Sequence, residues 1–92
     1  MKVFITGSKG YFGKPLVEKL GQNYEIAGYD IVDGNDILDY EKLKKAMNGS
    51  EIVIHAAAIP KPDETKTFED YFRTNCIGTL NVARACIENK IR

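Results

Sequence analysis

Residues 2–13 read KVFITGSKGYFG, in which an apolar, β-branched run passes directly into a segment with glycine at positions 7, 10 and 13. The run predicts a β-strand, and the glycines predict a tight turn. Pro15 follows, and proline is tolerated in the first turn of a helix because its missing N–H would have no partner there. The segment therefore predicts a strand, a tight turn and a helix that ends near Gly21.

The rest of the chain continues this alternation. The elements predicted after the first helix are a strand over Glu25–Asp30, a short strand or extended turn at Asp36–Leu38, a helix over Tyr40–Asn48, a strand over Glu51–Ala58 and a helix over Thr67–Asn89. Pro60 and Pro62 predict a loop before the last helix. Alternating strands and helices favour a parallel sheet, and a glycine-rich turn after the first strand is typical of the dinucleotide-binding fold. The expected fold is α/β, a Rossmann-like parallel sheet with flanking helices, truncated after about four strands.

The last strand and the last helix carry further expectations. In the strand order 3-2-1-4, the apolar strand over 51–58 lies at an open edge, which invites pairing with another chain. Residues at steps of three and four in the last helix predict one buried stripe: Phe68, Phe72, Cys76, Leu80, Ala83 and Ile87. The cluster of Phe68, Tyr71 and Phe72 is accordingly expected in the core. Gly78 is expected to pack closely against the sheet.

The composition limits the classes of partner. The 92 residues fit a single domain at most, and 13 Lys and Arg balance 13 Asp and Glu. Zero net charge provides no field that would attract nucleic acid or an anionic membrane. Residues 74–83, the longest stretch without a charged side chain, are about half as long as a membrane-spanning helix. Cys76 and Cys86 are too far apart on one helix to form a disulfide, and the first strand is too short for a signal peptide, so the cytoplasm is expected.

The glycine turn and Asp30 together indicate a dinucleotide site. Gly7 would permit the tight turn, Gly10 would let the backbone approach a pyrophosphate, and Gly13 would let helix and strand pack closely. Asp30 ends the second strand about 20 residues after Gly10, the interval at which an acid meets the ribose hydroxyls of NAD. Lys9 could instead meet a 2′-phosphate, so NADP is not excluded. The alternatives are an ordinary turn and a solvated acid at a strand end.

Five motifs follow one another in an order that resembles the extended short-chain dehydrogenase/reductases, the NAD-dependent epimerase/dehydratase family. They are T-G-x-x-G-x-x-G at 6–13, the acid at 30, an acid and an apolar residue at 36–37, V-x-H-x-A-A at 53–58 and N-x-x-G-T-x-N at 75–81. The chain resembles the N-terminal half of such enzymes over nearly its whole length. The resemblance implies that the cofactor site contains Gly7, Lys9, Gly10, Tyr11, Phe12, Gly13, Asp30, Asp36, Ile37, His55, Ala56, Ala57, Ala58 and Asn75.

Several of these residues also have a purely structural interpretation. His55 could be a core histidine with backbone partners, and Asn75 could bond a neighbouring loop. No set of residues is spaced as a metal site.

The resemblance also implies an enzyme that exchanges a hydride with the nicotinamide, assisted by a Ser or Thr and a Tyr-x-x-x-Lys pair. In the family this pair follows the fifth strand, so residues 1–92 are expected to be the N-terminal part of an NAD(P)-binding Rossmann domain, without the catalytic and substrate-binding parts. Tyr40 and Lys44 match the spacing but precede the strand over 51–58, so no catalytic residue is assigned. The implied substrate is a nucleotide-sugar or a similar small polar molecule. The alternative is a non-catalytic module that binds a dinucleotide or a protein.

The branch of the family stays open. Only residues 31–35 separate Asp30 from Asp36, so the helix that commonly joins the second and third strands is absent. This shortening resembles the dTDP-sugar reductases, whereas residues 55–60 and the helix of Asn75 resemble general epimerases and uronate-dehydrogenase-like oxidoreductases. Many relatives dimerise through helices around the one that starts near Thr67. We therefore expect a homo-oligomer, or self-association by exchange of elements.

Overall fold

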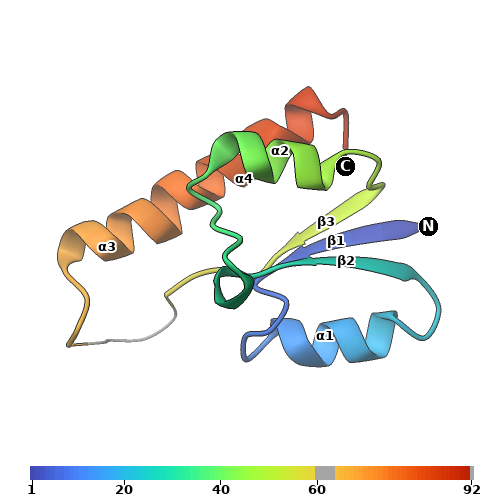
Figure 1. The fold of residues 1–92 in the computed structure, drawn as a ribbon, viewed down its shortest axis with the longest axis horizontal. Coiled ribbons are helices and arrows are strands. Elements are labelled where there is room, and N and C mark those ends of the chain that lie inside the picture. Colours follow the sequence, from blue (N-terminus) through green and yellow to red (C-terminus); the bar gives the residue numbers. More distant parts are fainter. Residues whose placement is uncertain (60–63, 92) are drawn as a thin grey trace.

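The computed structural model describes residues 1–59 and 64–91 (Figure 1). Its strands are β1 (Lys2–Thr6), β2 (Glu25–Tyr29) and β3 (Ile52–His55). Its helices are α1 (Gly13–Leu20), η1 (Ile31–Asp33, a 3-10 turn), α2 (Tyr40–Met47), α3 (Phe68–Phe72), η2 (Arg73–Ile77, a π-helical turn) and α4 (Gly78–Glu88). The loop expected at Pro60 and Pro62 lies outside the described residues.

β1 is the central strand of a parallel sheet in the order β2-β1-β3. Its Ile5 pairs with Gly28 of β2 on one side and with Ile54 of β3 on the other. The expected α/β class is therefore confirmed. In the part of the chain that the structure describes, β3 has a strand on one side only, which is the open edge that the sequence predicts.

The segment Asp36–Leu38 is a turn, so the described residues contain three strands rather than about four. The Asp36 carboxylate accepts a hydrogen bond from the Leu38 N–H at 2.9 Å, and the Tyr29 hydroxyl donates to the Asp36 carbonyl at 3.0 Å. Local bonds of this kind use backbone groups that a strand would pair with its neighbour. The strand expected to reach Ala58 also ends early, at His55.

The helices cover both faces of the sheet. α1 lies on one face, and α2 and α4 lie side by side on the other (Figure 1). The core is formed mainly between the sheet, α2 and α4, and it contains Phe4, Tyr29, Ile37, Leu43, Met47, Val82 and Ala85. Each large apolar side chain buried there stabilises the fold by about 1.5–3 kcal/mol. On the opposite face, β1 buries Val3 and Ile5, while Gly13 is the one buried residue that α1 contributes.

α3, η2 and α4 follow one another without a break and form the long helix that the sequence predicts. Thr67 caps its start, since the Thr67 hydroxyl accepts from the Asp70 N–H and the Asp70 carboxylate accepts from the Thr67 N–H. This reciprocal pair satisfies two donors that a helix start leaves open. Across the described residues, neither this helix nor any other has the length and apolarity needed to cross a membrane.

The buried stripe predicted for this helix is wrong. Phe68 is 85% exposed, Leu80 67% and Ile87 76%, and Phe72, Cys76 and Ala83 are exposed as well. The buried residues of α4 are Gly78, Val82 and Ala85. A Cβ at Gly78 would run into the side chain of Ile37, so the helix approaches the core with its small residues rather than its large ones.

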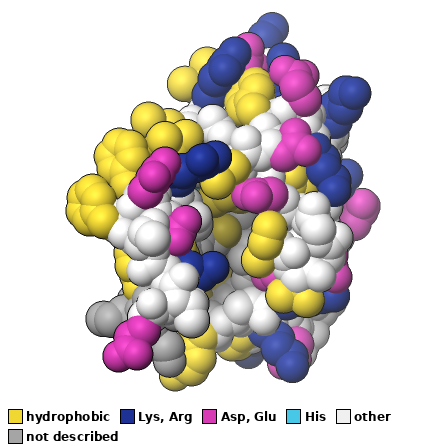
Figure 2. Space-filling view, turned by 60° about the vertical axis from the view of Figure 1, so that its left-hand side comes forward, with side chains coloured by type: hydrophobic (Ala, Val, Ile, Leu, Met, Phe, Trp, Pro, Cys, Tyr) yellow, Lys and Arg dark blue, Asp and Glu magenta, His cyan; other side chains and the backbone are white. Residues whose placement is uncertain are grey.

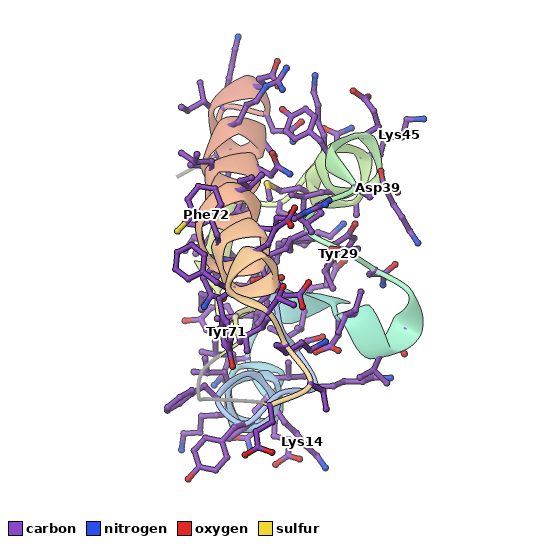
Figure 3. All side chains as sticks on the ribbon, turned by 90° about the vertical axis from the view of Figure 1, so that its left-hand side faces the viewer. Lys14, Tyr29, Asp39, Lys45, Tyr71 and Phe72 are labelled. Carbon is purple, nitrogen blue, oxygen red and sulfur yellow. The ribbon has the colours of Figure 1, made fainter. Side chains whose placement is uncertain are left out.

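Of the aromatic cluster expected in the core, Phe68 and Phe72 are exposed and Tyr71 is half-buried. Figure 3 shows Phe72 on the outer flank of the long helix, turned away from α2. Gly78 packs closely as expected, but against Ile37 of the turn rather than against the sheet. The periodicity identifies the face of large apolar residues, but the face that α4 buries is the opposite one.

Candidate functional site

A cleft of about 560 Å³ opens at the carboxyl ends of the three strands. Figure 2 shows a hollow near the middle of the face where these ends lie, with acidic and basic side chains around it. All but three of the residues predicted to contact a cofactor line the cleft: Gly7, Lys9, Gly10, Tyr11, Phe12, Asp30, Asp36, Ile37, Ala56, Ala57 and Ala58. The exceptions are Gly13, His55 and Asn75.

The glycine turn is tightly built against the end of β3. Gly7 has a φ of +66°, and a Cβ there would lie 2.8 Å from the Ala57 nitrogen, so both backbone conformation and space require glycine. The Gly7 N–H donates to the Tyr29 carbonyl at 2.9 Å, and the Gly10 N–H donates to the Gly7 carbonyl at 3.0 Å. A Cβ at Gly13 would collide with the Gly7 backbone. Gly13 thus supports the site from behind rather than lining it.

The turn leaves hydrogen-bond donors at the start of α1. The Lys14 N–H donates to the Gly10 carbonyl, but within the described residues no group accepts from the N–H of Tyr11, Phe12 or Gly13. No side chain caps the helix at Phe12. The start of a helix carries a partial positive charge together with such open donors, which is the arrangement that binds phosphate groups.

Asp30 is buried at the end of β2, with only 6% of its surface exposed, so the alternative of a solvated acid is wrong. Its Oδ2 accepts from the Lys9 N–H and its Oδ1 from the Val32 N–H, each at 2.9 Å. Because an ionised carboxylate has about four acceptor positions, two remain after these bonds. The backbone therefore fixes the direction in which Asp30 presents them at the cleft.

A second acid lies beside this group. The Lys9 ammonium contacts Asp33 Oδ1 at 2.6 Å and joins the glycine turn to η1. The hydrogen bond and the charge of Asp33 raise the pKa of Lys9 above its ordinary value. The Lys9 side chain is thus a paired cation at the mouth of the cleft.

The turn after η1 forms another wall. Burial, followed by the charges of Asp39 and Asp36, raises the pKa of Tyr29 to about 12, and its hydroxyl stays protonated to bond the Asp36 carbonyl. Asp36 borders the cleft while its carboxylate is engaged with Leu38. Ile37 also borders the cleft, but its side chain is buried in the core.

His55 lies behind the cleft in a chain of hydroxyl groups. The Thr6 hydroxyl contacts His55 Nδ1 at 2.7 Å, and Thr79 Oγ1 contacts His55 Nε2 at 2.9 Å. Thr6 Oγ1 already accepts from the N–H of Ala56 and Ala57, so its own proton goes to Nδ1. The network therefore assigns the proton of a neutral ring to Nε2.

Burial lowers the pKa of His55, which agrees with the neutral ring. The interpretation of His55 as a core histidine with backbone partners is right only in part, because the ring is half-buried and both of its partners are side-chain hydroxyls. Its role is to tie β1 to α4.

Asn75 bonds a neighbouring loop, as one of its two interpretations predicts. Its Oδ1 accepts from the Ile59 N–H at 2.8 Å, and its Nδ2 donates to the Ile59 carbonyl at 3.0 Å. Six residues further along the helix, Asn81 Nδ2 donates to the Ile37 carbonyl at 2.9 Å. The N-x-x-G-T-x-N motif therefore holds two segments of the cleft wall, through Ile59 and Ile37.

Other residues line the cleft that sequence reasoning missed: Tyr29, Ile31, Val32, Asn35, Leu38, Ile59, Lys66 and Thr74. Most of them flank Asp30, Asp36 or Ala58, so the rule that ligands bind beyond the carboxyl ends of parallel strands could have found them. Lys66 and Thr74 come from the segment around α3, and no local signal marks them. Within residues 1–59 and 64–91, no three His, Cys, Asp or Glu side chains gather as metal ligands.

A family model described as the NAD dependent epimerase/dehydratase family matches residues 3–92. The L-arabinose 1-dehydrogenase (NAD(P)(+)) of Haloferax volcanii is 31% identical in a match that covers 94% of this chain and 36% of that protein. The chain spans about a third of the length of the curated relatives that it matches.

Solved structures agree with this match. The dTDP-4-dehydrorhamnose reductase of Bacillus anthracis, in complex with NADP, is 32% identical with a TM-score of 0.85, over 99% of this chain and 34% of that one. A structure of MoeE5 in complex with UDP-glucose and NAD is 25% identical with a TM-score of 0.85, over 99% of this chain and 34% of the other.

Proposed function

Because the chain belongs to the NAD-dependent epimerase/dehydratase family, we propose that its cleft binds the adenosine and pyrophosphate parts of NAD(P). The observation that carries this proposal is the placement of two complementary groups on one cleft. Open N–H donors lie at the start of α1, and a carboxylate with fixed direction lies at the end of β2. The first group suits a pyrophosphate, and the second suits a pair of ribose hydroxyls.

The residues fit such a ligand at both ends. The N–H groups of Tyr11 and Phe12 would donate to the pyrophosphate, and the absence of a Cβ at Gly10 leaves the backbone open to it. The remaining acceptor positions of Asp30 would receive the ribose hydroxyls. Asp36 and Ile37 would border the adenine, while Ala56, Ala57 and Ala58 would form the floor of the cleft beneath the cofactor.

The whole protein is proposed to be an oxidoreductase, epimerase or dehydratase that acts on a nucleotide-sugar or a similar small polar substrate. When bound, the nicotinamide would supply hydride transfer. The proton-transfer groups, a Ser or Thr and a Tyr-x-x-x-Lys pair, are proposed to lie outside residues 1–92. Within the described residues Tyr40 and Lys44 match this spacing, but the Tyr40 hydroxyl bonds Glu88 and Lys44 lies 3.8 Å from the same carboxylate.

The setting of the protein is a proposal as well. We place it in the cytoplasm, where a pool of dinucleotide is available. The exposed apolar face of the long helix, seen among the apolar side chains at one edge of Figure 2, supports self-association. A non-catalytic dinucleotide-binding module remains the second candidate, because the cleft is built within residues that lack an assigned catalytic group.

The test is protection of the intact protein by NAD in thermal or chemical unfolding. At 100 times its dissociation constant, NAD should stabilise the folded state by about 2.7 kcal/mol. Gly10→Val should abolish this protection because its side chain occupies the approach to the Tyr11 and Phe12 amides. Ala46→Val is the matched control, since Ala46 is exposed on α2. Equal protection of the Gly10→Val and Ala46→Val variants would contradict the proposed site, and circular dichroism would show whether both variants fold.

A further inference from the structure

At the end of the cleft that holds Asp30, Lys9 forms a group with two carboxylates, those of Asp30 and Asp33. Lys9 contributes to it twice: its N–H donates to Asp30 Oδ2 at 2.9 Å, and its ammonium pairs with Asp33 Oδ1 at 2.6 Å. The Asp33 N–H in turn donates to the Asp30 carbonyl at 3.0 Å. Lys9 and Asp33 are thus attached on either side of the residue that is proposed to hold the ribose.

The pairing determines what Lys9 can do. An unpaired lysine at this position would be a ready partner for an anionic group on the ribose, because an ammonium is a strong phosphate donor. Here its charge is matched by Asp33, and the Lys9 and Asp33 side chains are 56% and 43% exposed. A phosphate that approached Lys9 would have to displace the Asp33 carboxylate while facing the buried Asp30 carboxylate.

We propose that the Lys9–Asp33 ion pair makes this cleft selective for a dinucleotide with a free 2′-hydroxyl over one that carries a 2′-phosphate. The inference rests on the proposed function and names the part of the site that chooses between NAD and NADP. Asp30 alone disfavours a 2′-phosphate by repulsion. Asp33 adds a second effect, because it engages the cation that would otherwise compensate for this repulsion.

The structure supplies the variants that separate these effects. Asp33→Asn keeps the shape of the side chain and removes the charge that neutralises Lys9, whereas Asp33→Asn combined with Lys9→Met removes the unneutralised cation as well. Among the described residues, Lys66 is the other cation that lines the cleft, and it comes from the segment before α3. Asp33→Asn combined with Lys66→Met is therefore the matched control. Asp33→Ser is a second charge-removing variant at the same exposed position.

Calorimetric titration of the intact protein would measure affinity for NAD, NADP, AMP and adenosine 2′,5′-bisphosphate. The last two ligands probe the adenosine end without the nicotinamide. We expect the wild-type protein to bind NAD at least tenfold more tightly than NADP. Asp33→Asn and Asp33→Ser should each improve binding of NADP and of the bisphosphate at least tenfold, while binding of NAD and AMP changes less than threefold. Lys9→Met should cancel this gain, and Lys66→Met should leave it in place.

Different outcomes would refute the selectivity of the ion pair and the binding of a dinucleotide by the cleft. If NAD and AMP bind but the Asp33 variants leave the NADP to NAD ratio unchanged, the ion pair does not set the selectivity. Persistence of the gain in the variant that also carries Lys9→Met would likewise overturn it, because removal of a negative charge alone would then explain the result. If the folded wild-type protein binds none of the four ligands, the proposed function fails and the selectivity fails with it.

Discussion

Replacement of Thr6 by valine exchanges a hydroxyl for a methyl group of similar size. We expect this exchange to lower the free energy of unfolding far more than its small change in shape would. Thr6 is fully buried, and its hydroxyl joins the end of β1 to the segment after β3 and to the histidine behind the cleft. Valine has nearly the same shape, so the change tests the hydroxyl rather than the packing. The substitution therefore isolates the polar network beneath the proposed cofactor site.

The magnitude follows from the partners that the hydroxyl serves. The Ala56 N–H keeps a second acceptor, the Thr6 carbonyl at 3.2 Å, so its loss is partly compensated. The Ala57 N–H and His55 Nδ1 lose the Thr6 hydroxyl as their hydrogen-bond partner, and each unsatisfied buried group costs about 1–3 kcal/mol. Because His55 is only half-buried and water can reach it in part, we expect a total loss of about 2–4 kcal/mol.

The assay is urea denaturation followed by circular dichroism, with two matched variants. Thr6→Ser keeps the hydroxyl and should cost about 1 kcal/mol for the lost methyl group. Thr79→Val removes the exposed hydroxyl on the other side of the His55 ring, and water replaces it, so the loss should stay below about 1 kcal/mol. Losses of equal size for Thr6→Val and Thr79→Val, or for Thr6→Val and Thr6→Ser, would refute the role assigned to the Thr6 hydroxyl.

Two further results should follow from the same structure. Stability should decline as the pH falls from 7.5 to 5, beginning near the ordinary His pKa of 6.5, because burial lowers the pKa of folded His55 and the unfolded chain therefore binds the proton first. Denaturation at a series of pH values should show a shallower decline for His55→Gln, and an unchanged slope would contradict this assignment. Leu43→Ala should cost about 2–5 kcal/mol because Leu43 is fully buried, whereas Phe68→Ala should change stability by less than about 0.5 kcal/mol. Chemical denaturation of both variants would measure the contrast, and similar losses would show that Phe68 is buried.

The sequence predicts those parts of the fold whose conformation depends on residues close together in the chain. The glycine turn, its strand and its helix were predictable because Gly7 must take a positive φ and because the turn joins two elements of clear pattern. Asp30 was predictable from its distance along the chain to the turn. Its burial was not, since it depends on the Lys9 N–H folding back across 21 positions of sequence.

The orientation of the last helix and the Lys9–Asp33 ion pair depend on contacts between distant parts of the chain, which no local pattern indicates. The last helix has an apolar face and a face of small residues, and periodicity alone favours the apolar one. The contact of Gly78 with Ile37, and the bond from Asn81 to the carbonyl of the same residue, orient the small face inward. The pairing of Lys9 with Asp33 is also invisible in sequence, because it requires the turn after β1 and η1 after β2 to lie side by side.

The hydrogen bonds of two asparagines fix the number of residues between two points of the long helix. Asn75 fixes the backbone at Ile59, and Asn81 fixes it at Ile37, six positions apart on one rigid element. Three of the six steps between them lie within α4, and the others include the π-helical turn η2. One inserted or deleted residue between them would turn the second anchor by about 100° and detach it. Chain length should therefore be held constant at this place.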